Sequence, residues 1–214
     1  MQLLEERVSM GLDFPVVVLF SWVGALLYLF EFESRIPPFA ARKLTHLSMG
    51  CLILSLFLRE SSRNSIFAQL GVGAIATGAI LLCFIRPFRF GQYRDKGIIS
   101  FNLLVLAFLI LGLDFGFLAP AFIADPLGAI VGRNVSSAKW IGEKTVAGSL
   151  AVLLGCLMAL FRVETLVTRV SLAFLCTLLE AIGGELDNLV MNIPVFAYYF
   201  ATTRGVVHGM LSVV

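Results

Sequence analysis

The richest group of chemically active residues in this 214-residue chain runs from Asp125 to Ser149. Backbone N–H groups beside glycines and the positive end of a helix dipole favour anions, whereas a hard divalent cation binds carboxylate and phosphate oxygens. The group therefore predicts binding of a nucleoside triphosphate, although it contains neither a Walker A loop nor a G-x-G-x-x-G turn. The alternative is a basic connecting loop whose glycines allow tight packing. Its members are Asp125, Gly128, Gly132, Arg133, Lys139, Lys144, Thr145, Gly148 and Ser149.

A smaller basic group, Arg42, Lys43 and His46, precedes an apolar stretch. Residues three and four positions apart share one face of a helix, so these three side chains are expected to lie together. They are interpreted either as part of a phosphate-binding surface or as an ordinary basic flank of a membrane helix.

An acidic group, Glu180, Asp187 and Asn188, follows a later apolar stretch. Glu180 and Asp187 are seven residues apart, which is two turns on one face if the helix continues through Gly183 and Gly184. Two carboxylates and an amide can coordinate a metal ion or accept a proton from a hydroxyl group. The alternative is a polar turn between two helices.

The rest of the chain indicates what must position these groups. It is 59% hydrophobic and 14% charged with a mean hydropathy of +0.95, whereas an ordinary soluble domain has about 25% charged residues. We therefore expect one all-α domain over residues 1–214, a polytopic membrane bundle of about seven to eight spanning or half-spanning helices. The formal charge of +2 and the lack of a basic run exclude a nucleic-acid partner. The apolar stretches are 14–30, 44–58, 66–85, 98–113, 115–131, 148–161, 166–182 and 189–203.

Ten of the sixteen Lys and Arg residues fall between apolar stretches in residues 31–43, 86–97 and 132–147. The positive-inside rule places these three segments, and with them all three polar groups, on the cytoplasmic face. Residues 98–131 are short for two full crossings, so we expect a short pair with a turn near residues 112–116 and a bend at Pro120. Asp125 then lies near the headgroups, where a carboxylate is costly unless paired or metal-bound.

Together the three groups resemble the CTP-dependent polyprenol kinases, the family of phytol kinase, dolichol kinase and the CTP-dependent diacylglycerol kinase. The resemblance covers about residues 40–195. It rests on Arg42-Lys43-x-x-His46, on Asp125-Pro126-x-x-Ala129 with Lys139 and Lys144-Thr145-x-x-Gly148-Ser149, and on Glu180 followed by Asp187-Asn188-Leu189. The chain departs from the family pattern at Ala147, where an acid usually precedes the Gly-Ser pair.

The resemblance implies transfer of the γ-phosphoryl group of CTP, with Mg²⁺, to the hydroxyl of a lipid alcohol dissolved in the bilayer. Asp125 and Asp187 are the expected metal ligands, and either His46 or Glu180 accepts the alcohol proton. The predicted catalytic residues are His46, Asp125, Lys144, Glu180 and Asp187. The predicted nucleotide-binding residues are Arg42, Lys43, Gly128, Gly132, Arg133, Lys139, Lys144, Thr145, Gly148, Ser149 and Asn188.

Two other functions fit parts of the pattern. A phosphatidate cytidylyltransferase also uses CTP, but its Pro-Gly-His-Gly-Gly run is absent and Gly183-Gly184-Glu185-Leu186-Asp187 resembles it only faintly. A small membrane transporter can line its path with polar residues, but the sequence shows no internal repeat typical of that class. Phytol, farnesol, longer polyprenols, dolichol and diacylglycerol all suit the apolar surface, so the sequence does not select the acceptor alcohol.

Overall fold

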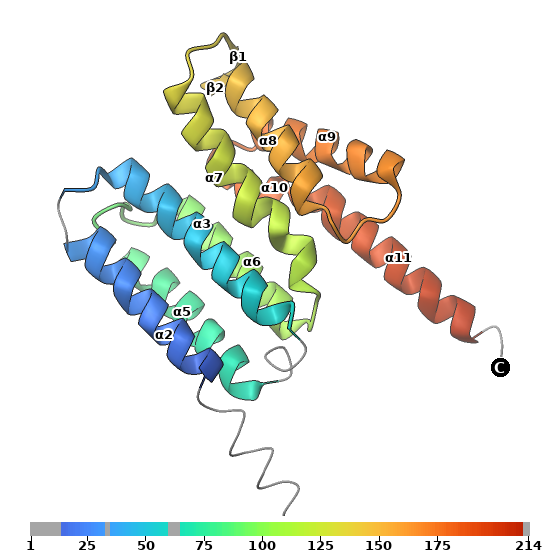
Figure 1. Cartoon of the computed structure of the whole chain (residues 1–214), viewed down its shortest axis with the longest axis horizontal. Coiled ribbons are helices and arrows are strands. Elements are labelled where there is room, and N and C mark those ends of the chain that lie inside the picture. Colours follow the sequence, from blue (N-terminus) through green and yellow to red (C-terminus); the bar gives the residue numbers. More distant parts are fainter. Residues whose placement is uncertain (1–13, 33–34, 60–64, 212–214) are drawn as a thin grey trace, which may run out of the picture. The chain divides into compact units, whose positions relative to one another are not determined.

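The computed structural model describes residues 14–32, 35–59 and 65–211, with side chains described as far as residue 202. The chain forms two compact units, Met1–Gly116 and Phe117–Val214, which are described separately here. Both consist almost entirely of helices (Figure 1). The expectation of a mainly helical protein is therefore confirmed.

The described residues of the first unit form four α-helices. Helix α2 runs into a short π-helical turn, η1, and packs against α3 and α5, while α5 and α6 form a closely packed pair. Ser65 caps the start of α5 by accepting a hydrogen bond from the N–H of Ala68, and Asp95 caps α6 in the same way. The elements are α2 (Phe14–Leu27), η1 (Tyr28–Phe32), α3 (Pro38–Phe57), α5 (Ile66–Ile85) and α6 (Lys96–Ile110).

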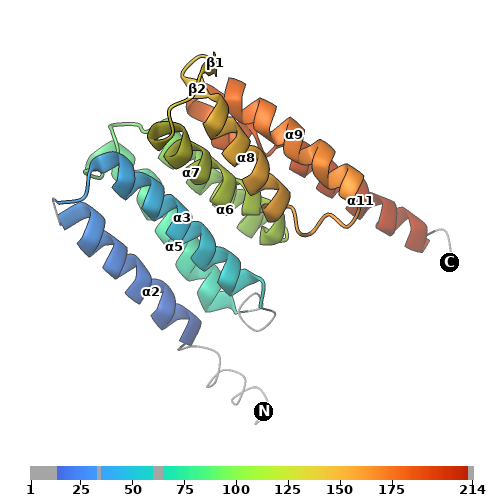
Figure 2. The same ribbon diagram turned by 45° about the horizontal axis from the view of Figure 1, so that its top comes forward.

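The second unit is built around the pair α7 and α8, with α9 packed on α8 and both α10 and α11 packed on α9. A two-stranded antiparallel hairpin joins α7 to α8 and lies at their end in both Figures 1 and 2. The elements are α7 (Ala119–Asn134), β1 (Lys139–Ile141), β2 (Lys144–Thr145), α8 (Val146–Ala159), α9 (Leu166–Ile182), η3 (Gly184–Leu186), α10 (Asp187–Val190) and α11 (Ile193–Leu211). The sequence analysis did not predict the hairpin.

Each of the eight predicted apolar stretches coincides with a helix. Three helical segments are long and apolar enough to cross a membrane, namely Pro15–Phe32, Ile66–Ile85 and Phe115–Asn134. The apolar helices α6 and α8 are shorter, with 15 and 14 residues. The structure thus shows apolar helices of membrane-spanning length, while the predicted number of crossings goes beyond what these lengths establish.

The predicted turn near residues 112–116 is present. Gly112 has a φ of +62°, a conformation that glycine adopts without strain, and the Asp114 carboxylate accepts a hydrogen bond from the N–H of Gly116. The predicted bend at Pro120 stays a prediction. Pro120 lies in the first turn of α7, where a missing N–H leaves no helical hydrogen bond unmade, and it is Pro126 that lies inside the helix.

Small residues let α7 and α8 approach closely. A Cβ added to Gly155 on α8 would lie 2.9 Å from the Cα of Ala124 on α7. A Cβ on Gly128 would lie 2.2 Å from Cγ2 of Val152. Without room for a side chain at these positions, the two backbones pack almost directly against each other, as small residues permit in membrane proteins. This contact fixes α7, and with it Asp125, against α8.

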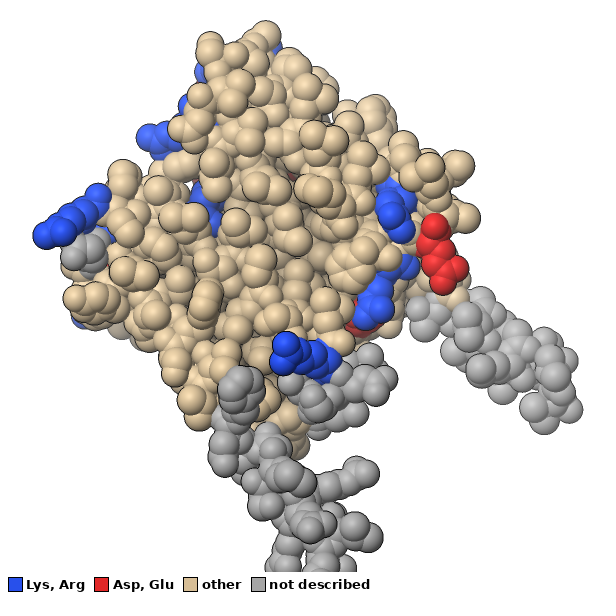
Figure 3. All heavy atoms as spheres, viewed as in Figure 1, with Lys and Arg blue, Asp and Glu red and all other residues tan. Residues whose placement is uncertain are grey.

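Apolar side chains cover the outer face of α8. Val146, Leu150, Leu154 and Met158 are spaced four residues apart and all are exposed. One side of α8 therefore presents a continuous apolar stripe, which is typical of a surface in contact with lipid. Figure 3 shows a face of the molecule on which charged side chains are few.

The cysteines behave as the sequence predicted, as small apolar residues. All four are free thiols, and Cys83, Cys156 and Cys176 are buried while Cys51 is exposed. Cys156 and Cys176 belong to the core of the second unit, which also includes Val152, Leu172 and Met191.

The contact between α7 and α8 predicts opposite outcomes for two glycine substitutions. We expect Gly155→Ala to lower the free energy of unfolding by about 1–3 kcal/mol, because the new methyl group meets the α7 backbone. Gly78→Ala serves as the control, since a Cβ there has no atom within 4 Å. It should leave stability unchanged or raise it by up to about 1 kcal/mol, the helix-propensity difference between the two residues. SDS-induced unfolding in mixed micelles measures both, and equal stability of the two variants would contradict the packing.

Candidate functional site

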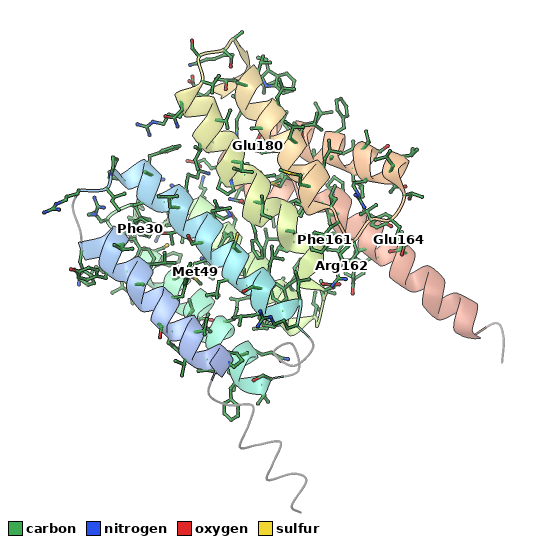
Figure 4. All side chains as sticks on the ribbon, viewed as in Figure 1. Phe30, Met49, Phe161, Arg162, Glu164 and Glu180 are labelled. Atoms are coloured by element: carbon green, nitrogen blue, oxygen red, sulfur yellow. The ribbon has the colours of Figure 1, made fainter. Side chains whose placement is uncertain are left out.

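Four charged side chains meet in the second unit. Asp125 on α7, Glu180 on α9 and Asp187 on α10 form an acidic cluster in which one carboxylate oxygen from each residue lies within 4.8 Å of the others. The ammonium group of Lys144 on β2 contacts Glu180 and Asp187. Figure 4 shows Glu180 far from Arg162 and Glu164, which lie near the opposite end of α9. Two residues of the group from Asp125 to Ser149 therefore meet two residues of the acidic group in one cluster.

A tight turn after α9 brings Asp187 back to Glu180. Helix α9 ends at Ile182, and Gly184 has a φ of +56°, so the two acids do not share one continuous helix as the seven-residue spacing suggested. Gly183 makes the close approach possible, because a Cβ there would lie 2.7 Å from the Cα of Asp187. Asp187 then starts α10, and its Oδ1 accepts a hydrogen bond of 2.9 Å from the N–H of Asn188.

The hairpin directs Lys144 to the acidic cluster. Strands β1 and β2 pair Lys139 with Thr145, and the turn between them contains Gly142 with a φ of +52°. The Nζ of Lys144 donates to Oδ2 of Asp187 at 3.1 Å and to Oε1 of Glu180. A lysine that the sequence placed in a basic loop is thus bonded to two carboxylates.

Charge compensation governs the site because the carboxylates are buried. Asp125 is 1% exposed and Glu180 3%. A buried carboxylate is stable as an anion only with a cation or several hydrogen bonds beside it, and Lys144 supplies that cation for Glu180 and Asp187. Burial by itself lowers the pKa of the Lys144 ammonium, but the Glu180 and Asp187 carboxylates outweigh this effect and raise its pKa above the usual value. Lys144 is therefore protonated at neutral pH.

The donor set of the acidic cluster fits a hard divalent cation. Three carboxylate oxygens from three helices lie within 4.8 Å of one another, close enough to bind one metal ion. Oxygen is the ligand atom that Mg²⁺ and Ca²⁺ prefer. Asn188 is 4% exposed, and its Oδ1 accepts no hydrogen bond from any described residue. The Oδ1 of the more deeply buried Asn192 is in the same state. The Oδ1 of Asn188, which follows Asp187 in the sequence, is therefore a further candidate acceptor for a cation or its water ligands.

The start of α8 differs from the anion site that the sequence suggested. In the structure its first three N–H groups, those of Val146, Ala147 and Gly148, already donate to protein oxygens. The acceptors are the carbonyl of Ala138 and the hydroxyls of Ser137 and Thr145, at 2.9, 3.0 and 3.2 Å. A phosphate can use these amides only if it replaces such partners.

Several predicted nucleotide-binding residues have structural contacts in this region. The Thr145 hydroxyl caps α8, and Ser149 accepts a hydrogen bond of 2.9 Å from the indole N–H of Trp140. Gly128, Gly132 and Gly148 lie in the contact between α7 and α8, which accounts for glycine at these positions. Their binding of nucleotide stays a prediction.

The two remaining cations of this group lie at the same end of the second unit as the hairpin. Arg133 is in the last turn of α7, and Lys139 begins β1, where its ammonium forms an exposed ion pair with Glu143. Exposed pairs of this kind are weak, so Lys139 can exchange Glu143 for a phosphate at little cost.

The first polar group belongs to the other unit. Arg42 forms two hydrogen bonds, of 2.8 and 3.0 Å, with the carboxylate of Asp95, which is 1% exposed. The His46 ring packs edge-on against Phe101, with 4.3 Å between ring centroids. Arg42 thus ties α3 to the start of α6. The roles predicted for Arg42, Lys43 and His46 in nucleotide binding and catalysis stay predictions.

Sequence reasoning missed three residues that matter to these sites. Asp95 precedes an apolar helix and has the position of an N-cap, a signal that could have identified it. Trp140 and Asn192 carry no motif. Their contacts depend on the hairpin and on the junction of α10 and α11, which only the folded chain shows.

The Arg42–Asp95 pair predicts a specific loss of stability. We expect Asp95→Ala to lower the free energy of unfolding by about 3–5 kcal/mol, because it removes the partner of a partly buried guanidinium and uncaps α6. Glu164→Ala, at an exposed position, should stay within about 0.5 kcal/mol of the unmodified protein. Unfolding by SDS in mixed micelles compares the two, and an Asp95→Ala protein as stable as the control would show that the pair is not structural.

Comparisons with known proteins do not identify the chain. No family model, no curated protein and no solved structure matches it. The resemblance to the polyprenol kinases therefore rests on the residues quoted for it above and stays a prediction. The chemistry of the site must be argued from its own side chains.

Proposed function

We propose that the protein is a multi-pass membrane kinase that transfers the γ-phosphoryl group of CTP to a lipid alcohol. The observation that carries the proposal is the convergence of Asp125, Glu180 and Asp187 with Lys144 at one end of a unit of apolar helices. Each of these residues belongs to a motif by which the sequence resembles the CTP-dependent polyprenol kinases.

Phosphoryl transfer suits such a site because the protein has little covalent chemistry to perform. The reaction needs the two substrates in line and the charge on the phosphate oxygens neutralised. Asp125, Glu180 and Asp187 would hold the metal, and Mg²⁺ when bound supplies charge neutralisation at the phosphates. Lys144 is close enough to the same position to bind a phosphate oxygen, and Arg133 and Lys139 lie at the same end of the unit.

In the proposed reaction the alcohol oxygen forms a bond to the γ-phosphorus while the bond between that phosphorus and the CDP oxygen breaks. The products are the lipid monophosphate and CDP. The hydroxyl proton passes to a base, for which Glu180 and His46 are the two candidates. Glu180 belongs to the acidic cluster, which supports it as a base beside the bound phosphates.

A membrane location for the chemistry follows from the surface around the site. The outer side of α8 is apolar from its first turn onward, so a lipid chain can lie along the helix while its hydroxyl reaches the interface. We further propose seven to eight crossings, because each predicted apolar stretch is helical, and a cytoplasmic site, because connecting segments rich in Lys and Arg favour that face. The use of CTP and of an isoprenoid alcohol rests on the resemblance alone.

The proposal predicts that the acidic cluster is essential for transfer. Detergent-solubilised protein with γ-labelled CTP, Mg²⁺ and a panel of lipid alcohols should yield labelled lipid. We expect Asp125→Asn and Glu180→Gln each to lower kcat by about 100-fold or more, since loss of a metal ligand removes several kcal/mol of transition-state stabilisation.

Glu164→Gln is the matched control, because it makes the same chemical change at an exposed position remote from the cluster. Transfer that survives in Asp125→Asn at the level of this control would remove the cluster from the mechanism. Release of pyrophosphate with the α-phosphate retained on lipid would instead indicate a cytidylyltransferase. Movement of a solute in liposomes without consumption of nucleotide would indicate a transporter.

A further inference from the structure

The ammonium group of Lys144 contacts two of the three carboxylates of the acidic cluster. Its Nζ lies against Oε1 of Glu180 and Oδ2 of Asp187, and one oxygen from each of these residues also belongs to the set that lies within 4.8 Å of Asp125. A Mg²⁺ ion binds oxygens at about 2.0–2.1 Å, so it can reach all three carboxylates only from the space between them. An ammonium bonded to two of the three and a metal bonded to all three exclude each other, both sterically and by charge.

From this overlap we infer that Lys144 is the internal counter-cation of the metal-free protein, and that binding of a divalent cation releases its ammonium group to bind phosphate. This inference rests on the proposed function for the role of the released lysine. Lys144 thereby couples the binding of the metal ion to the binding of phosphate, because its ammonium group becomes available to a phosphate only after the metal ion has bound.

The surroundings of Lys144 allow such an exchange. Its side chain is 29% exposed, whereas that of Glu180 is 4% exposed, so the lysine is on the solvent side of the pair. It lies on the second strand of a two-stranded hairpin, next to a glycine turn, and its four-carbon chain can turn the ammonium outward while the strand stays paired. The carboxylates themselves have no such freedom, because α7, α9 and α10 hold them in place.

Charge balance explains why an exchange is preferable to an empty site. Buried carboxylates without a cation are strongly destabilising, so a protein that must release and rebind its metal needs a substitute. Lys144 fills that place in one state and the divalent ion in the other. Asn188, adjacent to Asp187 in the sequence, is buried and its Oδ1 has no described donor, so this oxygen is a further candidate ligand in the metal-bound state.

The test is metal binding without nucleotide or lipid. The full-length protein in lipid nanodiscs is titrated with Mn²⁺, and free Mn²⁺ is followed by electron paramagnetic resonance. We expect Lys144→Met to bind Mn²⁺ at least about fivefold more tightly than the unmodified protein. The Lys144 ammonium no longer competes with Mn²⁺ for the carboxylates, and about fivefold is the lower end of the coupling usually found between two ligands. Lys139→Met is the matched control, and its affinity should change less than about twofold because its exposed ion pair lies outside the cluster.

A second measurement needs no variant and covers the case in which Lys144→Met does not fold. Amine acetylation of the unmodified protein is followed by mass spectrometry, and labelling of Lys144 should rise at least about fivefold with saturating Mn²⁺. Lys139 is the internal reference, and its labelling should stay constant. Unchanged labelling of Lys144, or Mn²⁺ affinity in Lys144→Met no tighter than in the unmodified protein, would overturn the exchange. Neither readout depends on CTP, so failure of the kinase assay and failure of the exchange are separate results.

Discussion

Compensation of buried negative charge is the constraint on which the second unit depends. Asp125 and Glu180 are almost completely buried, and their burial is stable only if cations and hydrogen bonds replace the water they have lost. Lys144 answers this need from a different element, so the end of α9, the start of α10 and the hairpin are held together by one set of ionic contacts. Apolar residues of similar volume often stabilise a core as well as a buried ion pair does, so stability alone does not account for these charges.

The arrangement of helices follows from this constraint and from the apolar surroundings. Small residues bring the backbones of α7 and α8 into close contact, which places Asp125 beside the helix that the hairpin precedes. The Gly183-Gly184 turn then returns the chain so that Asp187 reaches the same place. Gly128, Gly132 and Gly148, for which the sequence predicts phosphate binding, therefore serve helix packing. The predicted role is compatible with this one, because close packing of α7 and α8 brings the charged groups at their end together.

Much of the architecture could be predicted from sequence because it depends on local composition. Long apolar stretches identified the long helices of the described residues, and the glycines on either side of Asp114 identified the turn between α6 and α7. The hairpin escaped prediction because its strands are very short and its pairing depends on contacts with α8. The sequence did not show whether Pro120 or Pro126 lies inside a helix, because that depends on where the helix begins, and the structure places Pro120 in the first turn of α7 and Pro126 inside it.

The sequence predicted which residues form the candidate site, but not the ion pairs and hydrogen bonds between them. Residue types and spacing brought Asp125, Lys144, Glu180 and Asp187 together as one chemical proposal, and the structure places them in one cluster. The sequence did not indicate that Lys144 pairs with carboxylates, or that the amides of the α8 start are already satisfied. Both facts depend on which of several hydrogen-bonding groups pair in the folded chain. The spacing of residues in the sequence does not show this. Arg42 shows the same limit, since its partner Asp95 is 53 positions away.

The most direct measurement is the position of a bound metal ion. Crystals of the full-length protein soaked with Mn²⁺, recorded near the manganese absorption edge, give an anomalous map that locates the ion without ambiguity. The account predicts one peak at about 2.0–2.6 Å from carboxylate oxygens of Asp125, Glu180 and Asp187, with the Lys144 ammonium displaced from them. A peak at other residues, with Lys144 still bonded to Glu180 and Asp187, would contradict it.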